Sequence, residues 1–226
     1  MKRLLFAVLF FLTVMTAQAQ QITVYAAAGG IASQVEGDEL KGFAHWGLHG
    51  GVGSNVHFGN NDRWSMTLET DYSCRGIYNH KFSPENYYNI DLNLHYVDIP
   101  LTFFFRDPYG GIYIGLGLAY SRLLSQPHGT LDYRPEIFFP DTNDMGFLKN
   151  DLAGALEIKF YIWRGLQFST RFQYSLIPVK KDWHFQYGDQ QWANNCYNSS
   201  LTFRLLWEFG HEDKPSHYNR NKKRRR

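Results

Sequence analysis

The chain has 226 residues, of which 44% are hydrophobic and 17% aromatic, and its mean hydropathy is -0.40. This low hydropathy excludes a bundle of transmembrane helices, because each helix needs roughly 20 apolar residues in succession. The sequence pI of 8.4 reflects a cluster of seven Lys and Arg residues after Gly210, so it does not indicate a nucleic-acid surface on the body of the chain.

The first nineteen residues have the layout of a secretory signal. Lys2 and Arg3 precede an apolar run from Leu4 to Met15, and the small-residue motif Ala17-Gln18-Ala19 follows. The run is too short to span a membrane as a helix. We therefore expect residues 1–19 to be a signal peptide, residues 20–210 to form one all-β domain and residues 211–226 to form a basic tail.

Apolar and polar side chains alternate in about eight stretches, with the period of two that is typical of β-strands. Each stretch reaches the roughly 9–11 residues that a tilted strand needs to cross a membrane. In chain order they are 22–33, 43–58, 64–78, 88–105, 112–121, 151–162, 166–176 and 197–209.

The third stretch has two faces of opposite chemistry. Trp64, Met66 and Leu68 lie on one face, and Glu69 and Asp71 lie on the other. A soluble core would not accept such charges, whereas a small membrane barrel turns its polar face inward and its apolar face to lipid. The sequence therefore predicts an eight-stranded, antiparallel, up-and-down transmembrane β-barrel in preference to a soluble sandwich.

In the fourth stretch the alternation changes phase. Ile90, Leu92 and Leu94 are expected to face lipid, and so is the later run that begins at Ile99. This change requires one extra residue, a bulge, near Tyr96 to Asp98, just before a proline that cannot donate to a strand ladder.

The interior of an eight-stranded barrel is just wide enough for side chains to fill it. A salt-bridged plug is therefore expected in place of an open channel, although a narrow porin for small solutes remains an alternative. The expected members of the lumen network are Glu69, Asp71, Arg75, Asp91, His95, Asp98, Asp151, Glu157, Lys159, Arg171, Arg204 and Glu208.

The short turn Trp163-Arg164-Gly165 predicts a register for the two strands that it joins. If Ile162 pairs with Leu166, then Glu157 lies directly opposite Arg171 inside the barrel. Opposite Cβ atoms are about 4.5–5.5 Å apart, which lets a carboxylate meet a guanidinium.

Other candidate sites receive less support. His45 and His49 share a face with His57, but the first two are roughly 13 Å apart along a strand, too far to bind one metal ion. Ser121, Ser125 and His128 could serve a hydrolase at the barrel rim, yet no spacing brings them together. We expect this protein to bind no metal and no cofactor and to have no enzymatic activity. Cys74 and Cys196 are expected to be isolated thiols, with a disulfide as the alternative.

Connections after even-numbered stretches are short, and those after odd-numbered stretches include 79–87, 125–149 and 177–194. Short periplasmic turns with long external loops are typical of outer-membrane barrels, so both termini are expected in the periplasm. The tail is expected to be disordered or to contact an anionic periplasmic surface or protein. Its contact residues would be Lys222, Lys223, Arg224, Arg225 and Arg226.

Several short motifs resemble the small porin-like, or PorT-like, outer-membrane β-barrels of Bacteroidota. They are Gln34-Val35-Glu36-Gly37-Asp38, Tyr72-Ser73-Cys74-Arg75-Gly76, Leu94-His95-Tyr96-Val97-Asp98-Ile99-Pro100, Gly115-Leu116-Gly117-Leu118-Ala119-Tyr120 and Gln191-Trp192-Ala193-Asn194-Asn195. The resemblance implies an outer-membrane lipid environment and a structural, interaction or protein-secretion accessory role, with a possible partner in the secretion machinery. Members usually end at the last aromatic residue, here Phe209, whereas this chain continues. Asp98 stands where Glu is common.

Overall fold

The computed structural model describes residues 22–40, 42–59, 63–79, 88–107, 111–133, 138–140 and 146–209. The expected signal peptide and the basic tail lie outside the described residues. Within those ranges, no helix has both the length and the apolar character that a membrane crossing requires.

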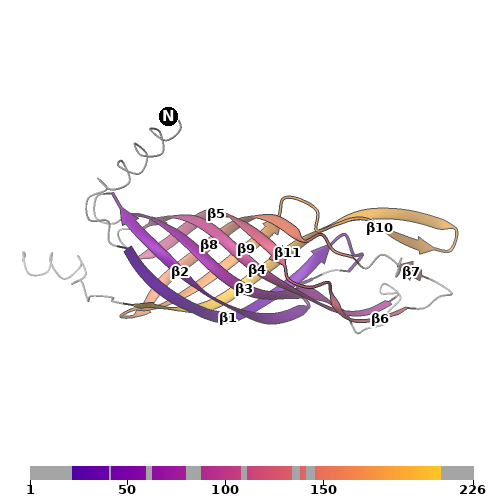
Figure 1. Ribbon diagram of the computed structural model, residues 1–226, viewed down its shortest axis with the longest axis horizontal. Coiled ribbons are helices and arrows are strands. Elements are labelled where there is room, and N and C mark those ends of the chain that lie inside the picture. Colours follow the sequence, from indigo (N-terminus) through magenta and orange to yellow (C-terminus); the bar gives the residue numbers. More distant parts are fainter. Residues whose placement is uncertain are drawn as a thin grey trace, which may run out of the picture.

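Eight antiparallel strands form a closed ring (Figure 1). Each strand pairs with its neighbours in the ring, and the pairing of β1 with β11 closes it. This confirms the predicted eight-stranded, up-and-down barrel. The strands are, in ring order, β1 (Ile22–Glu36), β2 (His45–Phe58), β3 (Trp64–Asn79), β4 (Tyr88–Arg106), β5 (Ile112–Leu123), β8 (Asn150–Trp163), β9 (Leu166–Ser175) and β11 (Gln190–Phe209).

Three further strands project from one end of the ring, away from Ile22 and Phe209 (Figure 1). β6 (His128–Tyr133) pairs with the start of β4, and β10 (Lys180–Tyr187) pairs with the start of β11 and with β7 (Phe138–Pro140). We call these three strands, together with the start of β4 and the start of β11 with which they pair, the extension. The connections 125–149 and 177–194, which the sequence predicts as long loops, contain these three strands.

The outer wall of the ring is apolar between two belts of aromatic side chains. Leu116 and Leu118 in the band between the belts are 68% and 54% exposed. One belt contains Trp64, Phe105, Trp163 and Trp207, and the other contains Tyr72, Tyr120, Tyr174 and Tyr197. At the usual rise and tilt, the eight positions from Trp64 to Tyr72 span about 20 Å of membrane thickness. Two aromatic girdles around an apolar band are typical of a barrel in a bilayer.

The structure corrects the prediction for β4. Its even-numbered side chains face inward from Ile90 to Phe104, so Leu92 and Leu94 are buried inside the extension and do not face lipid. Asp91 and His95 consequently face outward, outside the lumen network. The register of β3 with β4 is the same on both sides of Pro100, so the predicted bulge is absent from this pair. The alternation does not change phase: the even-numbered side chains stay inward, and they are apolar in the extension because its inside is apolar.

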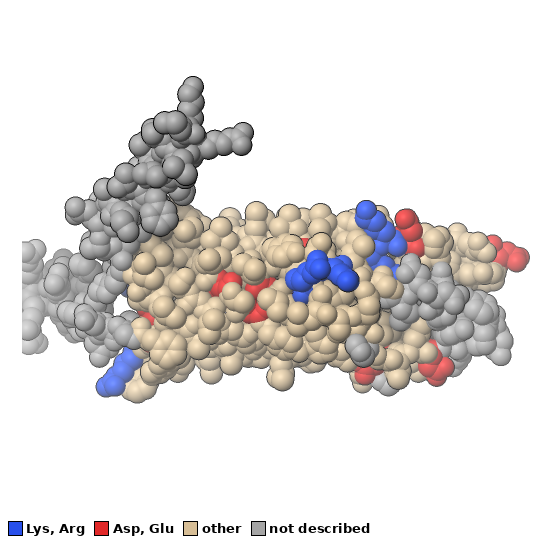
Figure 2. All heavy atoms as spheres, in the orientation of Figure 1, with Lys and Arg blue, Asp and Glu red and all other residues tan. Residues whose placement is uncertain are grey.

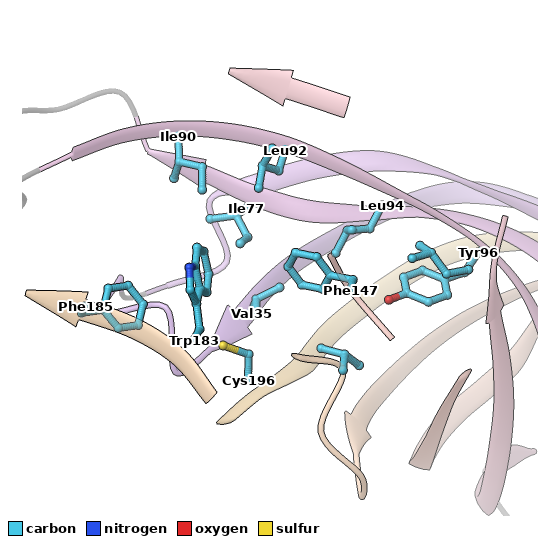
Figure 3. Close-up of a cluster of buried hydrophobic side chains, with 12 residues drawn as sticks. Val35, Ile77, Ile90, Leu92, Leu94, Tyr96, Phe147, Trp183, Phe185 and Cys196 are labelled. Carbon is cyan, nitrogen blue, oxygen red and sulfur yellow. The ribbon is translucent and has the colours of Figure 1, made fainter. Parts of the chain in front are cut away.

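An apolar core fills the extension (Figure 3). Ile77, Ile90 and Leu92 approach it from β3 and β4, while Trp183 and Phe185 approach it from β10. The full set of buried members is Val35, Ile77, Ile90, Leu92, Leu94, Tyr96, Leu123, Phe147, Val179, Trp183, Phe185 and Cys196. The extension is thus packed like a soluble domain.

Candidate functional site

The membrane-level lumen is filled by charged side chains from four strands. Alternation places Glu69 and Asp71 of β3, Glu157 of β8, Arg171 of β9 and Arg204 of β11 on the inner face of the ring. Each of these residues is no more than 2% exposed. We call these five residues the central cluster.

Glycines on the facing strands make room for these large side chains. A Cβ atom added to Gly51 of β2 would lie 2.1 Å from Asp71 Oδ1, and one added to Gly29 of β1 would lie 2.7 Å from the Cα atom of Arg204. Real Cβ atoms do not come so close to other atoms, so the inner wall beside the central cluster requires glycine at both positions.

Arg171 contacts all three carboxylates of the central cluster. Its Nε donates to Glu157 Oε2 at 2.7 Å and its Nη2 to Glu69 Oε1 at 2.6 Å, while Nη1 donates to Asp71 Oδ2 at 3.2 Å. Hydrogen bonds between ionised partners are the stronger kind, and a guanidinium can serve several acceptors in one plane. Arg171 therefore ties β9 to both β3 and β8.

Arg204 joins the same three carboxylates from β11. Its Nη1 donates to Glu69 and its Nη2 to Glu157 Oε1 at 2.7 Å, and Nη1 lies 3.6 Å from Asp71 Oδ2. Three carboxylates thus share two guanidinium groups. Tyr25 stabilises the excess negative charge by donating to Glu69 Oε1 at 2.7 Å.

A second cluster lies between the central cluster and the extension. Arg75 Nη2 donates to Asp98 Oδ2 at 2.8 Å, and its Nη1 lies 3.7 Å from Asp151 Oδ2. Ser73 donates to Asp98 at 2.7 Å and Ser175 donates to Asp151 at 2.8 Å. The Arg75 guanidinium also lies 5.2 Å from the ring centroid of Tyr96, where the apolar core of the extension begins.

At the other end of the lumen, near the short turns, Lys159 and Glu208 contact aromatic and polar side chains. Lys159 Nζ lies 3.9 Å from the ring centroid of Phe104, a cation–π geometry. Glu208 accepts hydrogen bonds from the Tyr161 hydroxyl at 2.5 Å and from Gln167 Nε2 at 2.8 Å.

The structure therefore brings most of the sequence-predicted network together. Glu69, Asp71, Glu157, Arg171 and Arg204 form the central cluster. Arg75, Asp98 and Asp151 form the second cluster, and Lys159 and Glu208 line the lumen nearby. Asp91 and His95 lie outside; His95 Nδ1 is 2.7 Å from the Tyr72 hydroxyl on the outer wall. The five tail residues are outside the described ranges.

The register expected for β8 and β9 is confirmed at the predicted ion pair, because Glu157 lies opposite Arg171. The pairing of Ile162 with Leu166 was wrong. Trp163 opposes Leu166, and the register shifts by one residue between Tyr161 and Trp163. A tight turn at Arg164, which has a positive φ of 46°, absorbs this shift before the strands reach the lumen cluster.

The sequence prediction missed the hydroxyl and amide groups that hold the carboxylates. Tyr25, Ser73, Ser169, Ser175 and Asn198 all donate to lumen acids. Each occupies an inward position on its strand, so the same alternation could have identified them. The sequence prediction considered charged residues alone, so it left out these hydroxyl and amide groups.

The candidate metal site does not assemble, and the side chain of His128, a candidate for the rim hydrolase, lies outside the described part of the structure. His45 lies 3.1 Å from Ser33 Oγ and His49 lies 3.6 Å from Asp71, and the described residues contain no group of three side chains placed to hold a metal ion. Ser121 is buried in the lumen between Asp98 and Asp151 of the neighbouring strands. Cys74 and Cys196 are free thiols.

A family model described as outer membrane protein beta-barrel domain matches residues 4–209. The chain belongs to this family. Membership in the outer membrane protein beta-barrel domain family places the ring in the outer membrane, in agreement with the apolar band and the aromatic belts. No curated protein matches the chain.

Several solved structures of outer-membrane proteins are similar to this member of the family. Neisserial surface protein A is 8% identical, over 84% of this chain and 100% of its own, with a TM-score of 0.45. Ail, the attachment invasion locus protein of Yersinia pestis, in complex with the heparin analogue sucrose octasulfate, is 14% identical, over 84% and 99%, with a TM-score of 0.43. OprG from Pseudomonas aeruginosa is 13% identical, over 85% and 98%, with a TM-score of 0.37.

Proposed function

We propose that this protein is a closed outer-membrane barrel with a structural, interaction or protein-secretion accessory role, and that it neither conducts solutes nor catalyses a reaction. The observation that carries the proposal is the central cluster. Two arginines and three carboxylates, all at most 2% exposed, connect β3, β8, β9 and β11 across the lumen. A solute would have to break these bonds to pass.

The extension supports an interaction role. Its apolar core is shielded from solvent, so it presents a preformed surface beyond the membrane. One hollow of about 420 Å³ opens between the β1–β2 connection and β3, lined by residues that include Gln34, Glu39, Leu40 and Tyr78. A preformed surface lowers the entropic cost of binding a partner.

The proposed orientation puts both termini and the three short turns in the periplasm and the extension outside the cell. It rests on the rule that periplasmic turns are short and external loops long. Removal of residues 1–19 as a signal peptide and a periplasmic contact through the basic tail belong to the same proposal. A partner in the secretion machinery would then meet either the tail or the extension.

Planar-bilayer recording tests the closed lumen. The folded protein, checked by heat-modifiable migration on gels, should insert without discrete conductance steps in 1 M salt, a condition chosen to give any pore a large current. Liposomes that contain it should not swell in a small sugar. Reproducible single-channel steps from the folded protein would contradict the proposal and favour a narrow porin.

A further inference from the structure

Exposed cations are unevenly placed at the two ends of the barrel. Within the described ranges, the Lys and Arg side chains that are exposed on the extension side of the membrane band are Arg122, Lys149 and Lys181. All three lie on one side, on β5, just before β8 and on β10. Figure 2 shows basic side chains gathered near the junction between the barrel and the extension.

Hydrogen bonds hold Arg122 at the membrane boundary and join the end of β5 to the backbone of Lys149. Arg122 Nη1 donates to Asn150 Oδ1 at 2.5 Å, and the Tyr120 hydroxyl donates to the same oxygen at 2.9 Å. The backbone N–H of Leu123 donates to the carbonyl of Lys149 at 2.8 Å. Because Tyr120 belongs to the aromatic belt, this anchors the guanidinium at the level where lipid headgroups lie.

Exposed apolar side chains lie on the membrane side of these cations. Leu118, Leu152 and Leu176 are 54%, 36% and 56% exposed, and Leu152 lies opposite Tyr120 of the aromatic belt. Cations at the edge of an apolar band suit a ligand that has both a phosphate and acyl chains, since the charge of a long-chain cation stays in the polar layer.

Acidic groups are scarce on this side. The outward positions of β5, β8 and β9 include no Asp or Glu, and Asp182, beside Lys181, is the exposed acid on the neighbouring part of β10. Asp91 of β4 faces outward near the same level on another side of the barrel, and Glu36 of β1 accepts a hydrogen bond from the Tyr174 hydroxyl of β9 at 2.9 Å. Positive charge therefore predominates on β5 and just before β8, and Glu36 lies at the β9 border of this surface.

We propose that Arg122, Lys149 and Lys181 form a docking site for the phosphate headgroup of a glycolipid in the outer leaflet, with its acyl chains against Leu118, Leu152 and Leu176 on the membrane side of these cations. The inference deepens the proposed function and rests on its orientation, because the site must face the outer leaflet. A lipid held there would set the angle at which the extension leaves the membrane.

Native mass spectrometry of the full-length mature protein in detergent tests the site. The probe is lipid A with two phosphates, compared with the same lipid A from which the phosphates have been removed. Substitution of both Arg122→Gln and Lys149→Gln should weaken binding of the phosphorylated probe about thirtyfold, the loss expected for two cations near a lipid headgroup. Binding of the dephosphorylated probe should not change.

Arg63→Gln with Arg164→Gln is the matched control, because it removes two exposed cations from the turns at the other end of the barrel. It should leave the affinity unchanged, and both double variants should retain heat-modifiable migration. An equal loss of affinity for phosphorylated lipid A in both double variants would overturn the site. Equal binding of the phosphorylated and dephosphorylated probes by the unsubstituted protein would also overturn it. Loss in the control pair alone would overturn the orientation, and neither outcome depends on whether the lumen conducts.

Discussion

The lumen at membrane level and the core of the extension are built on the same strands and the same inner face, yet their chemistry is opposite. On β4, the inward positions run from Ile90, Leu92 and Leu94 in the extension to Asp98 and Thr102 in the membrane. In the membrane the outer face meets lipid, so polar groups collect inside; beyond it the outer face meets water, so apolar groups collect inside. The solvent that meets the outer face therefore determines which side chains fill the inside.

Substitutions should therefore destabilise the two regions in different ways. Charges in the lumen are already desolvated, so removing one partner leaves another buried charge uncompensated. The extension is stabilised by apolar burial and close packing, so its losses should follow the volume removed.

The largest effect is expected from Arg171→Gln in the central cluster. It leaves Glu69, Asp71 and Glu157 sharing Arg204, and the free energy of unfolding should fall by about 3–5 kcal/mol. Glu157→Gln should cost less, about 1–2 kcal/mol, because two carboxylates and two arginines remain. The urea midpoint of the barrel in detergent measures both effects.

The double variant completes a double-mutant cycle for Glu157 and Arg171. Glu157→Gln with Arg171→Gln should be less destabilising than the sum of the single changes by more than about 0.5 kcal/mol, because the two side chains share a hydrogen bond and the same neighbours. Additive single effects would show that the central cluster is not a coupled unit.

Leu94→Ala should destabilise the extension by about 3 kcal/mol while the ring stays folded, because Leu94 is 0% exposed in the apolar core. Limited proteolysis of the β10–β11 hairpin measures whether the extension is folded. Heat-modifiable migration on gels measures whether the ring is folded. Leu116→Ala, at a position 68% exposed on the lipid face, is the matched control and should leave proteolysis unchanged. Loss of the ring in Leu94→Ala would mean that the two regions fold as one unit.

The smallest effect concerns Asp38, in the β1–β2 connection outside the membrane. Burial raises the pKa of its carboxyl to about 8, although the N–H of Leu40 donates to Oδ1 at 2.9 Å. The folded extension therefore keeps a proton that the unfolded chain loses above about pH 4, so the local stability falls as the pH rises from about 4 to about 8. Between pH 6 and pH 7.5 the loss should be about 1–2 kcal/mol.

Hydrogen exchange of the Leu40 amide, corrected for its intrinsic pH dependence, measures this loss. Asp38→Asn should remove the pH dependence, because the amide resembles the protonated acid. Asp189→Asn, at an exposed position in the β10–β11 turn, should leave it unchanged. A pH dependence that survives in Asp38→Asn would assign it to another group.

The alternation of side chains was enough to predict the ring, its inner face and the pairing of Glu157 with Arg171. It failed for Asp91 and His95 because alternation separates two faces without saying which one is inside. Reading Leu92 and Leu94 as lipid-facing assumed that the whole stretch 88–105 lies within the membrane, whereas the first part of β4 belongs to the extension. Strands β6, β7 and β10 were missed because they are short and are stabilised by pairing with β4 and β11, contacts that local sequence does not reveal.

The uninterrupted inner face of β4 also limits how this protein can evolve. Inserting or deleting one residue inside the strand would turn every side chain on one side of the change to the opposite face. Either Leu92 and Leu94 would meet water, or Asp98 and Thr102 would meet lipid. Changes of length should therefore accumulate in the connections between strands, and homologues should keep β4 at constant length while the rest of the extension diverges.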